Sequence, residues 1–137
     1  MASKTTEVPW SGIREAPVVL VSGPEAFLAD RALRVLGERL RSVSPELEVV
    51  DVDGSAAGSG ELTGAVSPSL FGEPRFVRIW SFEKSTDAVL ADLLDYLAAP
   101  DPSVTLVVRH ASGNRGKKAL DLIKAHGGDW LVVSVAP

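Results

Sequence analysis

The sequence contains no cysteine and only two histidines, and both facts remove kinds of site from consideration. Without cysteine, the 137 residues form neither disulfides nor thiolate metal sites. His110 and His126 fall on different predicted elements, so a histidine-rich metal site is not expected. We therefore expect a protein without bound metal.

Long apolar runs are also missing. A membrane-spanning helix needs roughly 18–20 consecutive apolar residues, and no stretch of the chain approaches that length. At the N-terminus, Lys4, Glu7 and Pro9 interrupt any apolar segment of the kind found in secretion signals. We expect a cytoplasmic protein that makes no contact with a membrane.

Positive charge is neither abundant nor concentrated. The chain has 14 Lys and Arg residues against 18 Asp and Glu, a formal net charge of -4, whereas phosphate-backbone binding depends on clustered cations. The densest basic cluster is Arg115, Lys117 and Lys118, which we interpret as the solvated start of a helix. A phosphate or DNA contact there is the alternative. Any contact of the protein with DNA is expected to be indirect.

The residues that are present predict one α/β domain. Hydrophobic residues make up 45% of the chain, enough for a packed core. Residues 1–16 are polar without an apolar period and are interpreted as a flexible leader, with Trp10 unexplained. In the remainder, short apolar strands alternate with amphipathic helices. Strands are predicted over 17–23, 47–52, 75–80, 104–108 and 130–135, and helices over 25–42, 61–66, 85–99 and 115–125.

This alternation is typical of a doubly wound, mainly parallel sheet, here five-stranded, with helices on both faces. The chain ends directly after the last predicted strand, where such a sheet normally continues into a covering helix. We interpret residues 17–137 as one domain of a longer protein.

The first strand and helix of such a sheet commonly hold a nucleotide phosphate. A phosphate-binding loop needs Gly, four residues, and then Gly-Lys-Ser/Thr. Here only Gly23 fits: Leu28, Ala29 and Asp30 occupy the positions of the second glycine, the lysine and the hydroxyl. Pro24 removes a further backbone amide. ATP binding is therefore not expected, and neither is any other cofactor.

No catalytic site is assembled elsewhere in the sequence. There is no Gly-x-Ser-x-Gly nucleophile motif. Asp51 and Asp53 alternate at the end of a predicted strand, and we interpret them as a polar sheet edge rather than as metal ligands. The protein is not expected to be an enzyme.

The most informative segment is 67–74, where Leu70 and Phe71 lie on a predicted surface connection. Pro68 and Pro74 each lack a backbone donor, and Gly72 permits a turn, so the segment is not expected to be a central strand. Two large apolar residues in such a place either fold back into the domain's own core or contact a partner.

Three segments together resemble a known family. In residues 20–28 the first strand ends in glycine, and Glu25 precedes Phe27 and Leu28. In residues 69–79, Ser-Leu-Phe-Gly-Glu leads into a strand, and in residues 93–108 a Leu-rich helix and two prolines precede an apolar strand. In this order and spacing, the sequence resembles the first domain of the delta subunit of the bacterial DNA polymerase III clamp loader. The likeness is to an actinobacterial-like form and covers about residues 17–137.

The resemblance implies a RecA-like, AAA+ clamp-loader domain whose phosphate loop has degenerated. It implies a non-catalytic subunit of a DNA-directed DNA polymerase holoenzyme, which binds the ring-shaped sliding clamp (the beta subunit) and helps to open one of its interfaces. The family's collar and lid domains are absent from this sequence, so contact with other clamp-loader subunits is expected of the full-length protein.

In this family, a Leu-Phe pair at the end of a helix plugs an apolar pocket on the clamp. By resemblance, the clamp-binding positions in this chain are Ser69, Leu70, Phe71 and Gly72. Glu73 and Arg75 are candidates for contacts at the rim of that interface.

Two other interpretations remain open at the level of sequence. One is a nucleotide-dependent enzyme or regulator built on a doubly wound sheet. The other is an interaction domain whose Leu-Phe segment binds a different partner.

Overall fold

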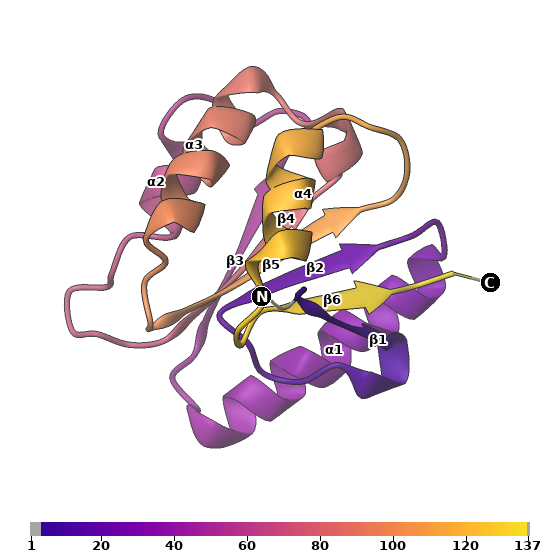
Figure 1. The fold of residues 1–137 in the computed structure, drawn as a ribbon. Helices are drawn as coiled ribbons and strands as arrows, with labels where there is room; N and C mark the ends of the chain where they lie inside the picture. The colour runs from indigo at the N-terminus through magenta and orange to yellow at the C-terminus, as the bar shows by residue number, and fades with distance from the viewer. Residues whose placement is uncertain (1–3, 137) are drawn as a thin grey trace.

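The computed structural model describes residues 4–136, which form an α/β fold around one parallel sheet (Figure 1). The six strands lie in the order β1-β6-β2-β5-β4-β3, and every neighbouring pair is parallel. Their bounds are β1 (Thr6–Pro9), β2 (Val18–Ser22), β3 (Glu48–Asp53), β4 (Arg75–Trp80), β5 (Val104–His110) and β6 (Leu131–Ser134).

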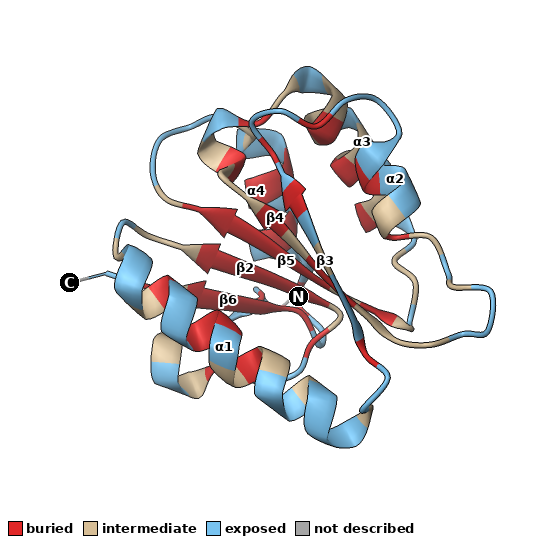
Figure 2. Cartoon of the chain, turned by 180° about the vertical axis from the view of Figure 1, so that it is seen from behind, coloured by how far each residue is buried: buried red, intermediate tan, exposed pale blue. Residues whose placement is uncertain are grey.

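Helices cover both faces of the sheet. The helix α1 (Ala26–Val43) lies on one face, while α2 (Glu61–Ala65), α3 (Asp87–Ala98) and α4 (Lys117–His126) lie on the other (Figures 1 and 2). The strand residues alternate between two buried clusters. Val18 and Leu20 of β2 pack with the three-helix side, and Val19 and Val21 pack with α1. The predicted α/β class with helices on both faces is thus confirmed, as is the parallel sheet.

The prediction of five strands is wrong, because the segment expected to be a flexible leader supplies a sixth. Residues Thr6–Pro9 form β1, which pairs in parallel with β6 at the edge of the sheet. A short 3-10 helix, η1 (Trp10–Gly12), follows, and Ile13 is fully buried in the α1-side core. Sequence offered little signal here, since β1 has one central apolar residue, Val8, and three of its four residues are exposed. Residues 1–3 of the expected leader lie outside the described part of the chain.

The buried face of the helix α1 follows a regular apolar repeat in the sequence except at the end of the helix. Ala29, Leu33 and Leu36 are buried against the sheet, at the spacing of one helical face. Val43, which the same spacing places on that face, is 79% exposed. It lies in the last turn of the helix, where periodicity continues but the sheet provides no further contact.

Within residues 4–136, no helix is both long enough and apolar enough to cross a bilayer.

Candidate functional site

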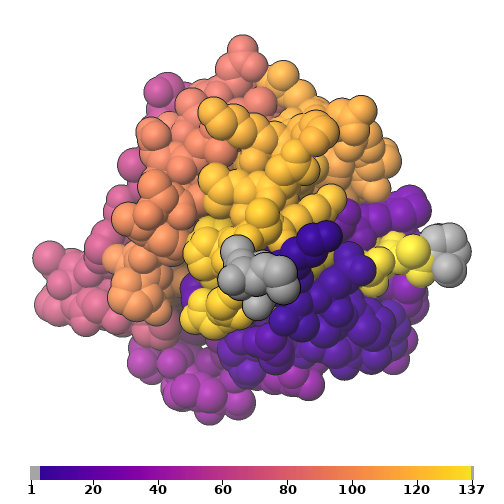
Figure 3. Space-filling view, viewed as in Figure 1, coloured from indigo at the N-terminus to yellow at the C-terminus, as the bar shows by residue number. Residues whose placement is uncertain are grey.

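The connection between α2 and β4 projects from the body of the domain (Figures 1 and 3). It carries the two most exposed large apolar residues in the described part of the chain: Leu70 is 90% exposed and Phe71 is 82% exposed. In Figure 2 much of the same segment is coloured as exposed. The possibility that this pair packs into the domain's own core is therefore wrong. The pair lies in a turn beyond the end of α2, separated from that helix by residues 66–69.

The turn itself is ordered by its own hydrogen bonds. The amide of Gly72 donates to the carbonyl of Ser69 at 3.2 Å, which closes a four-residue turn around Leu70 and Phe71. Gly72 has a φ of 72°, in the left-handed region that glycine adopts without strain. The Ser69 hydroxyl donates to a carboxylate oxygen of Glu73 at 2.7 Å. That hydrogen bond lowers the pKa of Glu73 below its ordinary value.

Arg75 holds the base of the loop. Its Nη1 donates to the carbonyls of Ser67 at 2.6 Å and Ala65 at 3.3 Å. Its Nε forms an ion pair with Glu48, 2.7 Å from the carboxylate oxygen. The sequence suggested a rim contact for Arg75, whereas the structure gives its guanidinium contacts within the domain. It is a positioning residue for the turn.

A hollow of about 300 Å³ lies beside the turn. It is lined by Glu46, Glu48, Ser69, Glu73 and Arg75. Glu46 and Glu48, which lie just before and at the start of β3, show no signal in the sequence that links them to this site. Glu48 and Arg75 are register partners on neighbouring parallel strands, and only knowledge of that register would have linked them.

The loop between β2 and α1, which occupies the position of a phosphate-binding loop in such sheets, is packed against the ends of neighbouring strands. The amide of Gly23 donates to the carbonyl of His110 at 3.1 Å, and the amide of Glu25 donates to the carbonyl of Val135 at 3.1 Å. Pro24, between them, has no amide hydrogen. The first three residues of this loop therefore offer no free backbone donor to a phosphate.

The remaining sequence candidates are engaged within the domain. Asp51 accepts hydrogen bonds from Arg78 at 2.7 and 2.9 Å and from the Trp80 indole at 2.8 Å, and its pKa is lowered mainly by the Arg78 bond. Asp53 accepts from Ser55, in the exposed turn that follows β3. Among the described residues, no three His, Asp or Glu side chains come together as a metal site.

The three basic residues of the 115–118 cluster have different surroundings in the structure. Arg115 donates to the Ser85 carbonyl at 3.0 Å and to the Asp87 carboxylate at 2.7 Å. Lys117 pairs with Asp121 one turn along α4, while Lys118 is exposed. Trp10, unexplained by sequence, packs against the α1-side core, and the Arg31 guanidinium lies over its ring at 5.2 Å.

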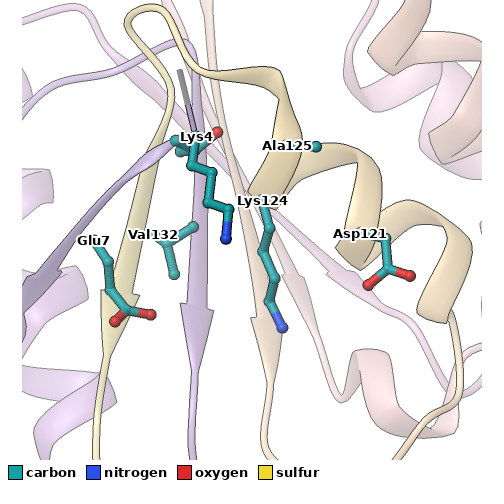
Figure 4. Close-up of a pocket in the computed structure, with 7 residues that line it drawn as sticks. Lys4, Glu7, Asp121, Lys124, Ala125 and Val132 are labelled. Carbon is teal, nitrogen blue, oxygen red and sulfur yellow. The ribbon is translucent and has the colours of Figure 1, made fainter. Parts of the chain in front are cut away.

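A larger hollow, of about 510 Å³, lies between β1 and α4 (Figure 4). The side chains of Lys4, Glu7 and Lys124 surround it, and Val132 contributes apolar surface. One of its walls is the strand that sequence analysis did not predict.

No family model matches the sequence, and no curated protein matches it. The fold and the loop define an α/β domain that presents an exposed Leu-Phe pair on an internally hydrogen-bonded turn.

Proposed function

We propose that this chain is the clamp-binding domain of a delta-type subunit of a bacterial clamp loader. Leu70 and Phe71 insert into an apolar pocket of the sliding clamp, and Ser69 and Gly72 shape the turn that presents them. The observation that carries the proposal is the exposure of this pair, 90% and 82%, on a turn held by its own hydrogen bonds. Isolated apolar residues are common on surfaces, but two adjacent large ones on a projecting, ordered turn favour a docking role.

The energetics fit a hot spot within a larger interface. Burying a Leu or Phe side chain contributes roughly 1.5–3 kcal/mol, so the pair supplies about 3–6 kcal/mol. Micromolar affinity corresponds to about 8 kcal/mol after the costs of association. Additional contacts at the rim are therefore required, and the half-buried Glu73 and the other carboxylates of the adjacent hollow are the candidates nearest the turn.

The proposed role involves no turnover and no cofactor. It is supported by the loop around Gly23, whose amides are already engaged with His110 and Val135, and by the absence of the phosphate-loop lysine. The net charge of -4 favours a protein partner over direct binding of DNA. Opening of the clamp and contact with other loader subunits belong to the full-length protein in this proposal.

The test is calorimetric titration of the chain into the sliding clamp of the same organism. The double variant Leu70→Ala/Phe71→Ala should remove measurable binding while remaining folded, because both side chains are exposed. Phe27→Ala is the matched control, since Phe27 is also exposed, at 67%, but lies at the start of α1. Its affinity should equal that of the native chain.

Two results would contradict the proposal. Native binding that survives the double substitution would place the contact elsewhere, and no binding by the native chain would reject the clamp as the partner. A parallel titration with ATP and magnesium tests the nucleotide-dependent alternative, and we expect no more binding heat than an equal concentration of inorganic phosphate gives.

A further inference from the structure

A polar hollow of about 280 Å³ lies at the carboxyl ends of β2 and β5. These strands are neighbours, yet the helices that follow them lie on opposite faces: α1 follows β2, and α4 follows β5. In parallel α/β sheets, a crevice opens at such a switch point, and ligands bind there. The hollow is lined mainly by Ser22, His110, residues 111–114, Lys117, Asp121 and Lys124.

His110 gives this hollow an unsatisfied polar group. The residue is only 4% exposed, and its Nε2 has no hydrogen-bond partner in the described part of the chain. Strand alternation places its side chain on the same face as Leu106 and Val108, which is the face covered by α4. A buried ring nitrogen without a partner is unfavourable unless a ligand or water completes its hydrogen bonding.

The charges around the hollow favour an anion. Two lysines, Lys117 and Lys124, and one carboxylate, Asp121, line the hollow, so its lining residues carry an excess of one positive charge. Burial lowers the pKa of His110, so its ring is mostly neutral near pH 7. Glu83, whose carboxylate accepts from the amide of Ala111 at 2.9 Å, does not line the hollow, but it keeps its negative charge close to His110.

The start of α4 adds to this field. The first turn has no acidic residue, and its N-cap, Gly116, has no side chain to cap the free amides. The positive end of the helix dipole is therefore not offset by the chain itself.

We propose that this hollow binds the phosphate group of a small molecule, held by His110, Lys117, Lys124 and the first turn of α4. The site is independent of the proposed clamp contact. The Leu-Phe turn precedes β4 and thus lies at the amino ends of the parallel strands, whereas the hollow lies at their carboxyl ends. It also differs from the phosphate-loop position, since it lies on the α4 face of the sheet. Lys117 shares its amine between Asp121 and the bound phosphate.

The test is nuclear magnetic resonance of the full chain titrated with inorganic phosphate at constant ionic strength, with chloride as the compensating anion. We expect saturable shifts of the His110 imidazole signals and of the backbone amides of 113–118. A second arm uses ribose 5-phosphate: tighter binding than inorganic phosphate identifies a phosphomonoester, and equal binding identifies the free anion. Absence of saturable shifts with both probes would overturn the proposal.

Two variants that each remove one positive charge separate a built site from general charge attraction. Lys124→Gln should weaken phosphate binding about tenfold, as expected for the loss of one charge-assisted hydrogen bond. Arg41→Gln removes the same charge from an exposed position in the last turn of α1, outside the hollow, and it should change affinity by less than about twofold. Equal weakening by both variants would show non-specific attraction only and would reject the site.

Discussion

Ser69 donates its hydroxyl hydrogen to a carboxylate oxygen of Glu73, 2.7 Å away, and so ties together the two ends of the turn that carries Leu70 and Phe71. The bond exists before any partner binds. A turn that is already ordered loses less conformational entropy on association, which improves affinity without adding a contact.

Under the proposed function, replacing Ser69 by Ala should therefore weaken clamp binding while changing the free energy of unfolding only slightly. The hydrogen bond is only partly buried, so its loss should lower the free energy of unfolding by no more than about 1 kcal/mol. The dissociation constant should rise about three- to tenfold, because part of the ordering cost now falls on binding. Urea denaturation and calorimetry measure the two effects separately.

Ser69→Thr is the control for that experiment, since it keeps a hydroxyl that Glu73 can accept from. It should bind the clamp like the native chain. If Ser69→Ala and Ser69→Thr weaken binding equally, the shape of the side chain rather than the hydrogen bond is responsible.

Two glycines with positive φ should respond very differently to alanine. Gly23 has a φ of 134°, and an added Cβ would lie 2.6 Å from the backbone oxygen of Val135. Gly72 has a φ of 72°, with no atom within 4 Å of the added Cβ. Gly23→Ala thus combines strain with a backbone clash, whereas Gly72→Ala brings strain alone.

We expect Gly72→Ala to lower the free energy of unfolding by about 1–2 kcal/mol at most, the usual cost of the left-handed region for a residue with a Cβ. Gly23→Ala should cost about 3 kcal/mol or more, because backbone must move as well. Urea denaturation of both variants measures the difference. Similar losses would show that the Gly23 loop moves freely and is not fixed by β6 and its continuation.

The stability of the domain should decrease as the pH falls below neutrality because of His110. Its pKa is lowered from 6.5, mainly by burial, although Glu83 opposes that shift. The unfolded chain therefore takes up a proton at a higher pH than the folded chain does. The contribution of His110 to stability is complete above about pH 6.5 and is lost as the pH falls toward the lowered pKa.

Urea denaturation at several pH values between 7.5 and 5 measures this effect. The carboxylates with lowered pKa values, such as Asp51 and Glu73, have ordinary values of 3.8 and 4.5, so their contributions are lost only at lower pH. His110→Gln should flatten the dependence above pH 5. A native chain whose stability stays constant over this range would contradict the prediction.

The fold could be predicted where hydrophobic periodicity is strong. Continuous apolar runs such as 18–21 and 104–108 locate the central strands, because both faces of a parallel sheet are buried. The same signal is missing in β1, whose stability comes from pairing with β6 and from buried Thr5, both distant in sequence. The apolar repeat also places Val43 on the buried face of α1, although this residue is exposed, because a repeat in the sequence does not indicate where contact with the sheet ends.

The candidate site could be predicted only in its apolar part. A Leu-Phe pair between prolines and a glycine is visible in the sequence, but only the structure shows that the pair is exposed. The role of Arg75 depends on β3 and β4 pairing in a register that sets it beside Glu48. The polar hollow near His110 depends likewise on the strand order, which brings residues 22 and 110 together from far apart in the chain.

The N-terminal segment is fixed by Thr5, and its hydroxyl should matter measurably for stability. Thr5 is 7% exposed; its amide donates to the Lys124 carbonyl at 3.0 Å, and its hydroxyl donates to the Ile123 carbonyl. The same hydroxyl accepts from the Gly127 amide at 2.9 Å. Thr5 thereby satisfies backbone groups at the end of α4 that the helix leaves without partners.

Thr5→Val keeps the shape of the side chain but removes both hydroxyl bonds, leaving a buried amide and a buried carbonyl with one partner fewer. The free energy of unfolding should fall by about 2 kcal/mol, and hydrogen exchange at the Gly127 amide should accelerate by at least as much as global unfolding predicts. Thr5→Ser retains the hydroxyl and should lose less than half of that amount. If Thr5→Val is as stable as the native chain, the stability of the domain does not depend on the hydrogen bonds of the Thr5 hydroxyl. That result would favour the flexible N-terminal segment that the sequence predicts.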